Sequence, residues 1–497
     1  MIRPTTSIRF IALALIGGAV SLGGCVTEDP PPIPPRSNIL LVTVDTLRAD
    51  HLSAYGYPRE TSPVIDRLAA EGVRFDQPAV QWPKTGPSMA SMFTATYPKD
   101  NGIVRRIGQP LPCRFEMLAE TLQRAGYQTH AVVANAALAS DFYFDQGFDT
   151  YIETWKLDPP EDGSDPNRAE AVTQLALGLL DRIESEKNED GQTKPYFLWV
   201  HYLDPHAPYV PPGEWRDGFQ DDEYFDPTER ITIADKPRQQ MTGIGRDQVL
   251  DGRDELAFYR ARYDAEIFYT DFQIGRLLEE VDVRGLRERT MTVFTSDHGE
   301  SLGEHRYYFD HGRFGFQTCV RVPFIVHYPG VLAPRVDEAP AELLHLTPTL
   351  LEAAGVELEE GQRWRQGRSL TPRLLGETPE APTLAYSEAG WETKNKWQKI
   401  VRDERFKLVF AQTRPEQRWI GGEGVRFTLF DLREDPEETR NVAEEYPEDL
   451  ERLQRLLSAW NGADRFDPLL DEVGGACGDE RSMGGETESL LKSLGYL

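Results

Sequence analysis

The feature that most constrains the fold is a series of short apolar runs, rich in β-branched residues, with helical patterns between them. The first run, residues 38–45 (NILLVTVD), is almost continuously apolar, which is typical of a strand buried on both faces of a parallel sheet. Similar runs occupy residues 129–134, 196–202, 290–296 and 322–327. This alternation predicts an α/β domain with a doubly wound, mostly parallel sheet.

The helical segments between these runs carry recognisable end signals. Ser62 offers an N-cap, Pro63 suits a first helical turn, and Gly72 suits a stop. Residues 168–185 and 254–283 also have helical patterns. Residues 155–167 and 213–253 are predicted as surface insertions, most simply solvated loops, although long loops can also form substrate walls.

The pattern changes after about residue 370. Residues 399–410 and 426–432 are predicted as short strands, and residues 444–460 as a helix. These elements predict a smaller C-terminal α+β subdomain packed on the main sheet. The tail, residues 474–497, is glycine-rich and then amphipathic.

Composition excludes two broad classes. The 497-residue chain has 82 acidic and 54 basic side chains, a formal net charge of −28, so it is a poor general nucleic-acid binder. Its 39% hydrophobic and 10% aromatic content is enough to build a core, which excludes a disordered chain. At this length we expect one large domain with a smaller appendage, or two domains.

The N-terminus has the features of an export signal. Arg3 and Arg9 precede an apolar stretch, residues 8–20, that is shorter than the ~20 residues a membrane span needs. The segment Leu22-Gly23-Gly24-Cys25 resembles a bacterial lipobox. We therefore predict a lipoprotein signal peptide (1–24), a lipidated Cys25 that anchors the mature chain in a cell-envelope membrane, and a Pro-rich tether (25–37). A plain secretory peptide or an uncleaved anchor are the alternatives.

The other cysteines, Cys113, Cys319 and Cys477, are odd in number and widely spaced, which argues against a metal or redox motif. The simplest interpretation is that they are small buried side chains, with one disulfide permitted in an exported chain.

Three polar positions follow predicted buried elements. Asp45 and the pair Asp297-His298 each end a predicted strand, where ligands of α/β sheets bind. Their oxygen and nitrogen atoms suit Zn²⁺ or Mn²⁺. Thr85 stands just before a predicted helix, residues 87–95, whose N-terminus suits a tetrahedral oxyanion. Each signal is weak alone, since a threonine there is usually a cap, but a metal beside Thr85 would make it a nucleophile.

Motifs along nearly the whole mature chain resemble those of sulfatases, a family of the alkaline phosphatase superfamily. In order, they are NILLVTVD (38–45), TLRADH (46–51), YGY (55–57), TSPVIDRLAAEG (61–72), PS (87–88), TATYP (94–98), DPHAPY (204–209), SDHGE (296–300), LGEH (302–305), RVPFI (321–325), LTPTLL (346–351), RFKL (405–408), LFDL (429–432), DPEET (435–439) and LGYL (494–497). The resemblance implies an alkaline-phosphatase-like catalytic domain over residues 38–370 and a subdomain with tail over residues 371–497.

The departures from the family pattern bear on the chemistry. Thr85 occupies the place of the cysteine or serine that sulfatases oxidise to formylglycine, and Met89 replaces the motif's arginine. Thr46 stands where a second aspartate is usual. A threonine cannot give that aldehyde, so Thr85 resembles instead the direct nucleophile of the superfamily's phosphodiesterases and phosphotransferases.

The resemblance also implies roles for single residues. Asp45, Asp297 and His298 would hold one, or with a second site two, divalent cations (Zn, Mn or Ca), with Thr85 completing the shell. His206 resembles the family's substrate-contacting histidine, as against a simple turn residue. His311, Lys84 and Arg48 are candidates for contact with an anionic ester substrate. Asp204, Asp310 and His311 could build a second metal site or none. We interpret His51, His201 and His305 as structural.

Three functions remain open from the sequence. The first is a metal-dependent hydrolase of sulfate or phosphate esters in which Thr85 favours phosphate or phosphonate esters. The second is a transferase of phospho-head groups onto envelope glycans. The third is a non-catalytic envelope binding protein that keeps the fold.

Overall fold

The central sheet of the computed structural model has eight strands in the order β12-β2-β11-β8-β1-β5-β3-β4. Their bounds are β1 Asn38–Val44, β2 Val73–Ala79, β3 Gln128–Val133, β4 Thr150–Glu153, β5 Tyr196–Tyr202, β8 Thr290–Ser296, β11 Phe324–His327 and β12 Arg335–Glu342. The structure describes residues 33–104, 108–158, 163–187, 191, 193–219, 224–234, 243–356, 366–390, 397–412, 427–462 and 481–494.

Most strand pairs are parallel, as the alternating pattern predicts. Only β11 runs antiparallel, to β8 on one side and β2 on the other. Strands β2, β4 and β12 have partly exposed residues and therefore lack the continuous apolar runs that reveal the other five.

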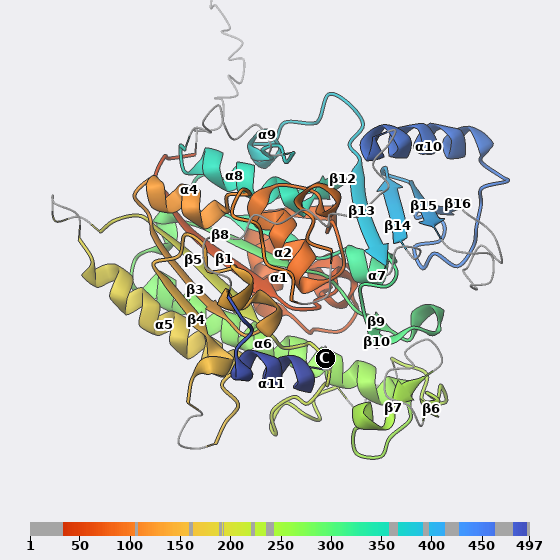
Figure 1. Cartoon of the computed structure of the whole chain (residues 1–497), viewed down its shortest axis with the longest axis horizontal. Helices are drawn as coiled ribbons and strands as arrows, with labels where there is room; N and C mark the ends of the chain where they lie inside the picture. Colours follow the sequence, from red (N-terminus) through yellow and green to blue (C-terminus); the bar gives the residue numbers. More distant parts are fainter. Residues whose placement is uncertain are drawn as a thin grey trace, which may run out of the picture. The chain divides into compact units, whose positions relative to one another are not determined.

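Helices cover both faces of this sheet (Figure 1). One face packs against α2 (Thr85–Thr94), α4 (Leu118–Arg124) and α8 (Leu346–Ala353). The other packs against α1 (Pro63–Glu71), α5 (Ala169–Ser185) and α6 (Leu256–Val283). The doubly wound prediction is thus confirmed. Within the described ranges, no helix combines the length and the apolar character needed to cross a membrane.

A second, antiparallel sheet follows in the chain. It consists of β13 (Ala385–Gly390), β14 (Trp397–Arg402), β15 (Phe406–Gln412) and β16 (Phe427–Asp431), with α10 (Pro447–Asn461) packed on it. The prediction of one strand over residues 399–410 is wrong. The side chain of Asp403 accepts hydrogen bonds from the amides of Arg405 (2.8 Å) and Phe406 (2.6 Å), so the segment turns into a hairpin.

The remaining elements are short. They are α3 (Pro98–Asn101), α7 (Gln317–Val320), α9 (Thr371–Leu374), α11 (Gly485–Ser493), β6 (Ile233–Ala234), β7 (Ile244–Gly245), β9 (Ser301–Leu302) and β10 (Tyr308–Asp310). Helix α11 buries Leu491 in the core of the main domain, not against the second sheet.

The sequence predictions for the N-terminus and the cysteines are only partly covered by the described residues. The signal peptide, Cys25 and Cys477 lie outside the described residues. Cys113 is disulfide-bonded, and Cys319 is a buried free thiol.

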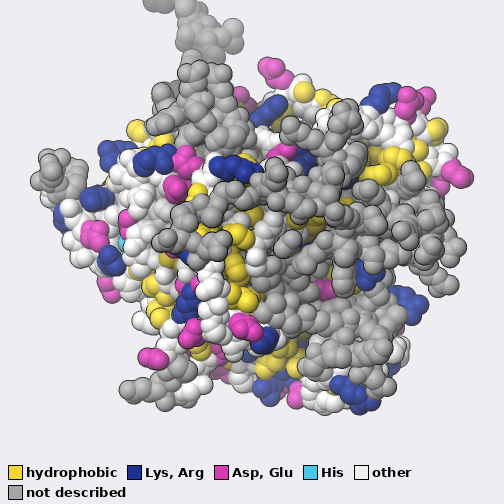
Figure 2. All heavy atoms as spheres, viewed as in Figure 1, with side chains coloured by type: hydrophobic (Ala, Val, Ile, Leu, Met, Phe, Trp, Pro, Cys, Tyr) yellow, Lys and Arg dark blue, Asp and Glu magenta, His cyan; other side chains and the backbone are white. Residues whose placement is uncertain are grey.

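On the face shown in Figure 2, the basic and acidic side chains of the described residues are interspersed.

The N-terminus of α1 is capped by a different residue from the one predicted. The hydroxyl of Ser62 bonds to the Asp66 side chain (3.0 Å) and caps no backbone amide. Instead, Asp271 of α6 accepts from the amides of Val64 (2.9 Å) and Ile65 (2.8 Å). This buried carboxylate therefore ties α6 to α1.

Burial raises the pKa of Asp271 from 3.8 to about 7. The folded state favours the protonated form, so the stabilising contribution is present below the unfolded pKa and is lost as the pH rises through 7. We predict that wild type loses about 3 kcal/mol of stability between pH 5 and pH 8 relative to Asp271→Asn, which cannot ionise. Urea denaturation of both proteins at the two pH values measures this difference. Equal pH dependence would contradict it.

Candidate active site

The register of the sheet brings two aspartates together. Strand β1 lies parallel to β8 with Val44 opposite Ser296, so Asp45 and Asp297 leave neighbouring strands at the same level. The amide of Thr46 donates to Asp297 Oδ1 (3.2 Å), which fixes one loop against the other. Both carboxylates are fully buried.

Thr85 and His298 complete the set that the sequence predicted as metal ligands. Thr85 is the first residue of α2, and its Oγ1 lies 3.2 Å from His298 Nε2. The same Nε2 lies 3.2 Å from Asp297 Oδ2 and 4.0 Å from Asp45 Oδ1. The structure thus gathers the four predicted residues in one buried cluster.

A fifth residue, His201, belongs to this cluster and was missed by interpreting it as structural. It lies near the carboxyl end of β5, opposite Thr43, whose Oγ1 is 2.8 Å from His201 Nδ1. Its Nε2 is 3.4 Å from Asp45 Oδ2. Asp45, His201 and Asp297 each offer a ligand atom, and these atoms lie within 4.8 Å of one another. The signal available in the sequence was its place near the end of a buried strand, the same reason that selected Asp45.

The electrostatics of the cluster fit a cation. Asp45 Oδ1 and Asp297 Oδ2 are buried and accept no hydrogen bond within the described residues. Burial, and then the charge of Asp45, raises the pKa of Asp297 well above its usual range. Burial also acts to raise the pKa of Asp45, but the hydrogen bond to His201 and the charges of His206 and His298 lower it to about 2. Two unsatisfied carboxylate oxygens beside imidazoles are donors that suit a divalent metal ion.

A second pair of histidines lies beside the cluster. The His311 ring is 4.1 Å from the His298 ring and 5.5 Å from the His206 ring, measured between centroids. Glu300 Oε1 lies 3.3 Å from His311 Nδ1, and His206 Nδ1 donates to the carbonyl of Ala207 (2.7 Å). These side chains place two imidazoles within reach of a molecule bound at Thr85.

The open possibility of a second metal at Asp204 is not supported. Its Oδ1 pairs with Arg168 (2.5 Å), and its Oδ2 accepts from the amide of Ala169 (2.9 Å). Asp204 therefore anchors the loop that carries His206. In the described part of the chain, the cluster containing Asp45 is the only group of three ligands close enough to hold a metal.

The two predicted cationic contacts differ in their surroundings. Lys84 is buried and packs against Gly312, where an added Cβ would lie 2.4 Å from its Cε, so it lies beside His311. Arg48 is held by Asp50 (2.7 Å) and Glu304 (2.7 Å). These carboxylates already compensate its charge, so its place in the structure favours a structural role, and substrate contact stays a prediction.

Comparison with known proteins is decisive for the family. The sulfatase family model matches residues 37–356. The chain belongs to the sulfatase family. A second model, N-sulphoglucosamine sulphohydrolase, C-terminal, matches residues 303–459 of this sulfatase-family hydrolase. The predicted relationship to the alkaline phosphatase superfamily is therefore confirmed.

Individual relatives are distant in sequence but similar in length. The choline-sulfatase of Rhizobium meliloti is 28% identical over 455 residues, covering 82% of this chain and 83% of its own. The structure of BT4656 in complex with D-glucosamine-2-N,6-O-disulfate has a TM-score of 0.68 at 22% identity, covering 87% of this chain and 98% of its own. The phosphonate monoester hydrolase of Agrobacterium radiobacter has a TM-score of 0.65 at 24% identity, covering 85% and 95%. The two structures show that the fold is shared.

The cluster predicts how metal content responds to substitution. We expect Asp45→Asn and Asp297→Asn each to retain less than about a tenth of the divalent metal bound by wild type, because each removes one carboxylate charge. His201→Ala should weaken binding by about ten- to a hundredfold. Mass spectrometry of metals after dialysis measures these losses, with His206→Ala as the control that keeps its metal. Equal metal content in all four variants would show that the metal binds elsewhere.

Proposed function

We propose that this sulfatase-family hydrolase is metal-dependent and cleaves phosphate or phosphonate esters in preference to sulfate esters, with Thr85 as its direct nucleophile. The observation that carries the proposal is the position of Thr85 Oγ1, at the N-terminus of α2, 3.2 Å from His298 Nε2 and beside the two unsatisfied aspartate oxygens. A threonine here cannot supply the aldehyde of a formylglycine enzyme. Its hydroxyl can attack phosphorus directly.

Each protein residue has a definable task in this chemistry. Asp45, Asp297, His298 and Thr85, with His201 beside Asp45, would hold the cation, which when bound supplies Lewis-acid stabilisation of negative charge. Thr85 loses its hydroxyl proton to solvent, and Oγ1 attacks phosphorus opposite the leaving oxygen. The bond to the leaving oxygen breaks, and water then cleaves the phospho-threonine ester.

The surrounding side chains would bind the substrate and move protons. The positive end of the α2 dipole faces the substrate oxygens, and Lys84, next to His311, adds positive charge. His206 would donate a proton to the leaving oxygen, because it stands on the loop anchored by Asp204 and close to His311. His311, oriented by Glu300, would hydrogen-bond the substrate.

Two relatives support this proposal. One relative is named a choline-sulfatase, and the structural neighbour from Agrobacterium radiobacter is named a phosphonate monoester hydrolase. The fold therefore accommodates both sulfur and phosphorus esters. The residue at position 85 is what favours phosphorus here. Transfer of the phosphoryl group to an added alcohol in preference to water would favour the head-group transferase instead, and metal-free protein without turnover would favour the binding protein.

The location of the reaction is also a proposal. A lipid on Cys25 and the tether over residues 25–37 would hold the enzyme at an envelope membrane, with the catalytic domain over residues 38–370 and the subdomain and tail over residues 371–497. Substrates would then be anionic esters outside the cytoplasm. Metabolic labelling with a radioactive fatty acid, compared between wild type and Cys25→Ser, tests this proposal, and equal labelling would contradict it.

Substitution of Thr85 tests the nucleophile. We predict that Thr85→Ala lowers kcat for p-nitrophenyl phosphate and p-nitrophenyl phenylphosphonate by about a thousandfold or more, whereas Thr85→Ser keeps at least about a tenth, because it restores a hydroxyl. Intact-protein mass spectrometry of acid-quenched wild type should show a phosphate adduct on Thr85. Wild-type rates in Thr85→Ala, or faster cleavage of p-nitrophenyl sulfate than of either phosphorus ester, would refute the proposal.

Substitution of His206 tests the proton donor. We expect His206→Ala to slow cleavage of phenyl phosphate by about a hundredfold, but that of p-nitrophenyl phosphate by less than about tenfold, because nitrophenolate leaves without a proton. Steady-state kinetics with both esters gives the comparison, and retained metal shows that the site is intact. An equal loss with both esters would assign His206 to binding instead.

A further inference from the structure

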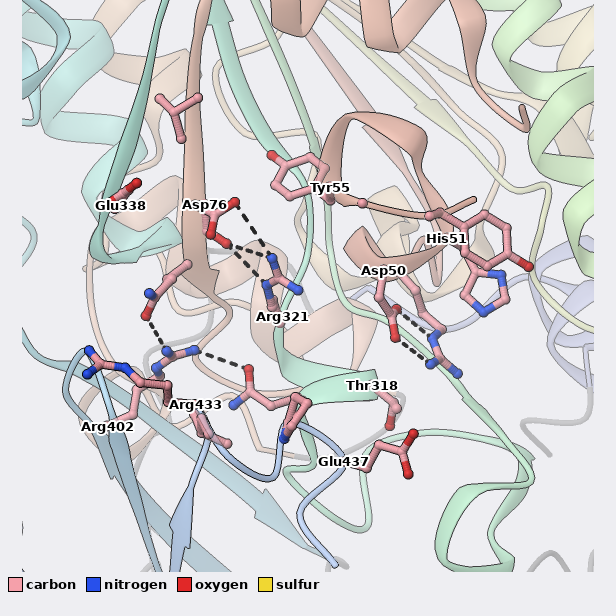
Figure 3. A pocket seen from close by; sticks show the side chains of 18 of the residues that line it. Asp50, His51, Tyr55, Asp76, Thr318, Arg321, Glu338, Arg402, Arg433 and Glu437 are labelled. Carbon is pink, nitrogen blue, oxygen red and sulfur yellow. Dashed lines mark hydrogen bonds and ion pairs between the residues drawn. The ribbon is translucent and has the colours of Figure 1, made fainter. Parts of the chain in front are cut away.

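A large cavity lies outside the catalytic cluster. Its volume is about 1230 Å³, and its walls include Asp76 and Gln77 of β2, Gln317 of α7, and Arg402, the last residue of β14 (Figure 3). Asp45, Thr85, His201, Asp297 and His298 are absent from its lining. The cavity therefore contains no residue of this cluster, although its walls include Arg48, the predicted substrate contact that Asp50 and Glu304 hold.

Arg402 is the unusual residue of this cavity. Its side chain is buried, with the residue only 5% exposed, yet its hydrogen bonds go to neutral acceptors. They are the side-chain oxygens of Gln317 (3.1 Å) and Gln77, and the carbonyl of Asp403 (3.3 Å). Within the described residues no carboxylate forms an ion pair with it. Burial, and then the charge of Arg321, lowers the pKa of Arg402 to about 10, although the charges of Glu438, Asp403 and Asp76 act in the opposite direction. A buried cation without a direct ion pair is costly.

Several donors around Arg402 remain unused. A guanidinium has five N–H groups, and the three hydrogen bonds above occupy only part of them. Gln317 Nε2 is buried and has no partner in the described part of the chain. Arg321 reaches the same cavity, and its Nε and Nη2 donate to the carbonyl of Asp76 at 3.1 and 2.9 Å, with the nearest Asp76 carboxylate oxygen at 3.9 Å. The N–H donors of Arg402, Arg321 and Gln317 thus outnumber the acceptors that they contact in the described part of the chain.

Among the described residues, the acidic side chains near Arg402 do not form ion pairs with it. Glu438 is buried but pairs with Lys407 (2.5 Å), and Asp337 pairs with Arg373 (2.6 Å). Glu338 and Glu437 are exposed, and Figure 3 shows them apart from Arg402. Exposed carboxylates interact weakly through water, so they compensate a buried guanidinium poorly. Ten carboxylates and six arginines line the cavity, so it is acidic as a whole, and Arg402 is a buried positive group within it that lacks a direct ion pair among the described residues.

We propose that Arg402, Arg321 and Gln317 form a second anion-binding site that takes a tetrahedral oxyanion, sulfate or phosphate. The planar guanidinium presents two parallel N–H groups, which matches two oxygens of such an anion. The volume of the cavity leaves room for the anion to arrive free or as a substituent of a larger molecule. Arg433, exposed on the same cavity, adds positive charge at the entrance.

Equilibrium dialysis of the metal-loaded full chain with ³⁵S-labelled inorganic sulfate tests this proposal. Wild type should bind two sulfates, one at Thr85 and one at Arg402. Arg402→Gln should bind one, with affinity at the lost site reduced at least tenfold, and Arg402→Lys should retain weakened binding. Arg433→Ser, which alters only an exposed side chain, should weaken the same site several-fold and covers the case in which Arg402→Gln fails to fold. The matched control is Arg455→Gln, an exposed arginine on α10 outside the cavity.

The outcomes separate this site from the catalytic one. Two sulfates retained by folded Arg402→Gln, or unchanged binding in Arg433→Ser, would overturn the proposal. Lys84→Ala should lose only the sulfate at Thr85, so failure of that variant to do so counts against the catalytic assignment alone. Displacement of labelled sulfate by sulfoquinovose, a sugar sulfonate, at lower concentration than by methanesulfonate would assign a sugar-borne anion. Equal displacement would assign a free anion, and both results support the site.

Discussion

The candidate active site depends on one constraint: two buried carboxylate groups lie close together, and neither can neutralise the charge of the other. Asp45 and Asp297 are brought together because β1 and β8 are parallel neighbours in register, and parallel strands end at the same edge. Burial makes their mutual repulsion strong, and hydrogen bonds satisfy only part of each group. His201, His298 and the first turn of α2 surround these two carboxylates. A cation bound at this point would relieve this electrostatic penalty.

The sequence predicts the elements that are apolar throughout and fails where packing decides. Strands β5 and β8 match their predicted bounds because every residue in them is buried. Strand β12, with the sequence RVDEAPAE, carries charges on an exposed edge, so no apolar pattern marks it. Similarly, the hairpin at Asp403 depends on one side chain accepting two amides, which interrupts an otherwise continuous strand pattern.

The residues of the candidate site also fall into two groups, those that a local motif reveals and those that only tertiary contacts reveal. Motifs identified Asp45, Thr85, Asp297 and His298, because each ends or begins an element with a clear signature. His201 was missed because it is one residue from the end of β5, and only the pairing of that strand with β1 shows that it faces Asp45. Likewise, one of the two carboxylates that pair with Arg48, that of Glu304, is 256 positions away in the chain, and no local pattern reveals this contact.

The placement of α11 has a consequence for how the chain folds. Leu491 is fully buried in the core that also contains residues of β1 and α2, and Thr487 accepts a hydrogen bond from Trp155 (3.3 Å). The last described helix thus completes a domain whose first strand starts at residue 38. During vectorial synthesis, that core stays open until α11 has emerged. Maturation of the catalytic domain is therefore a late event, and a chain truncated before α11 would leave an apolar surface exposed to chaperones and proteases.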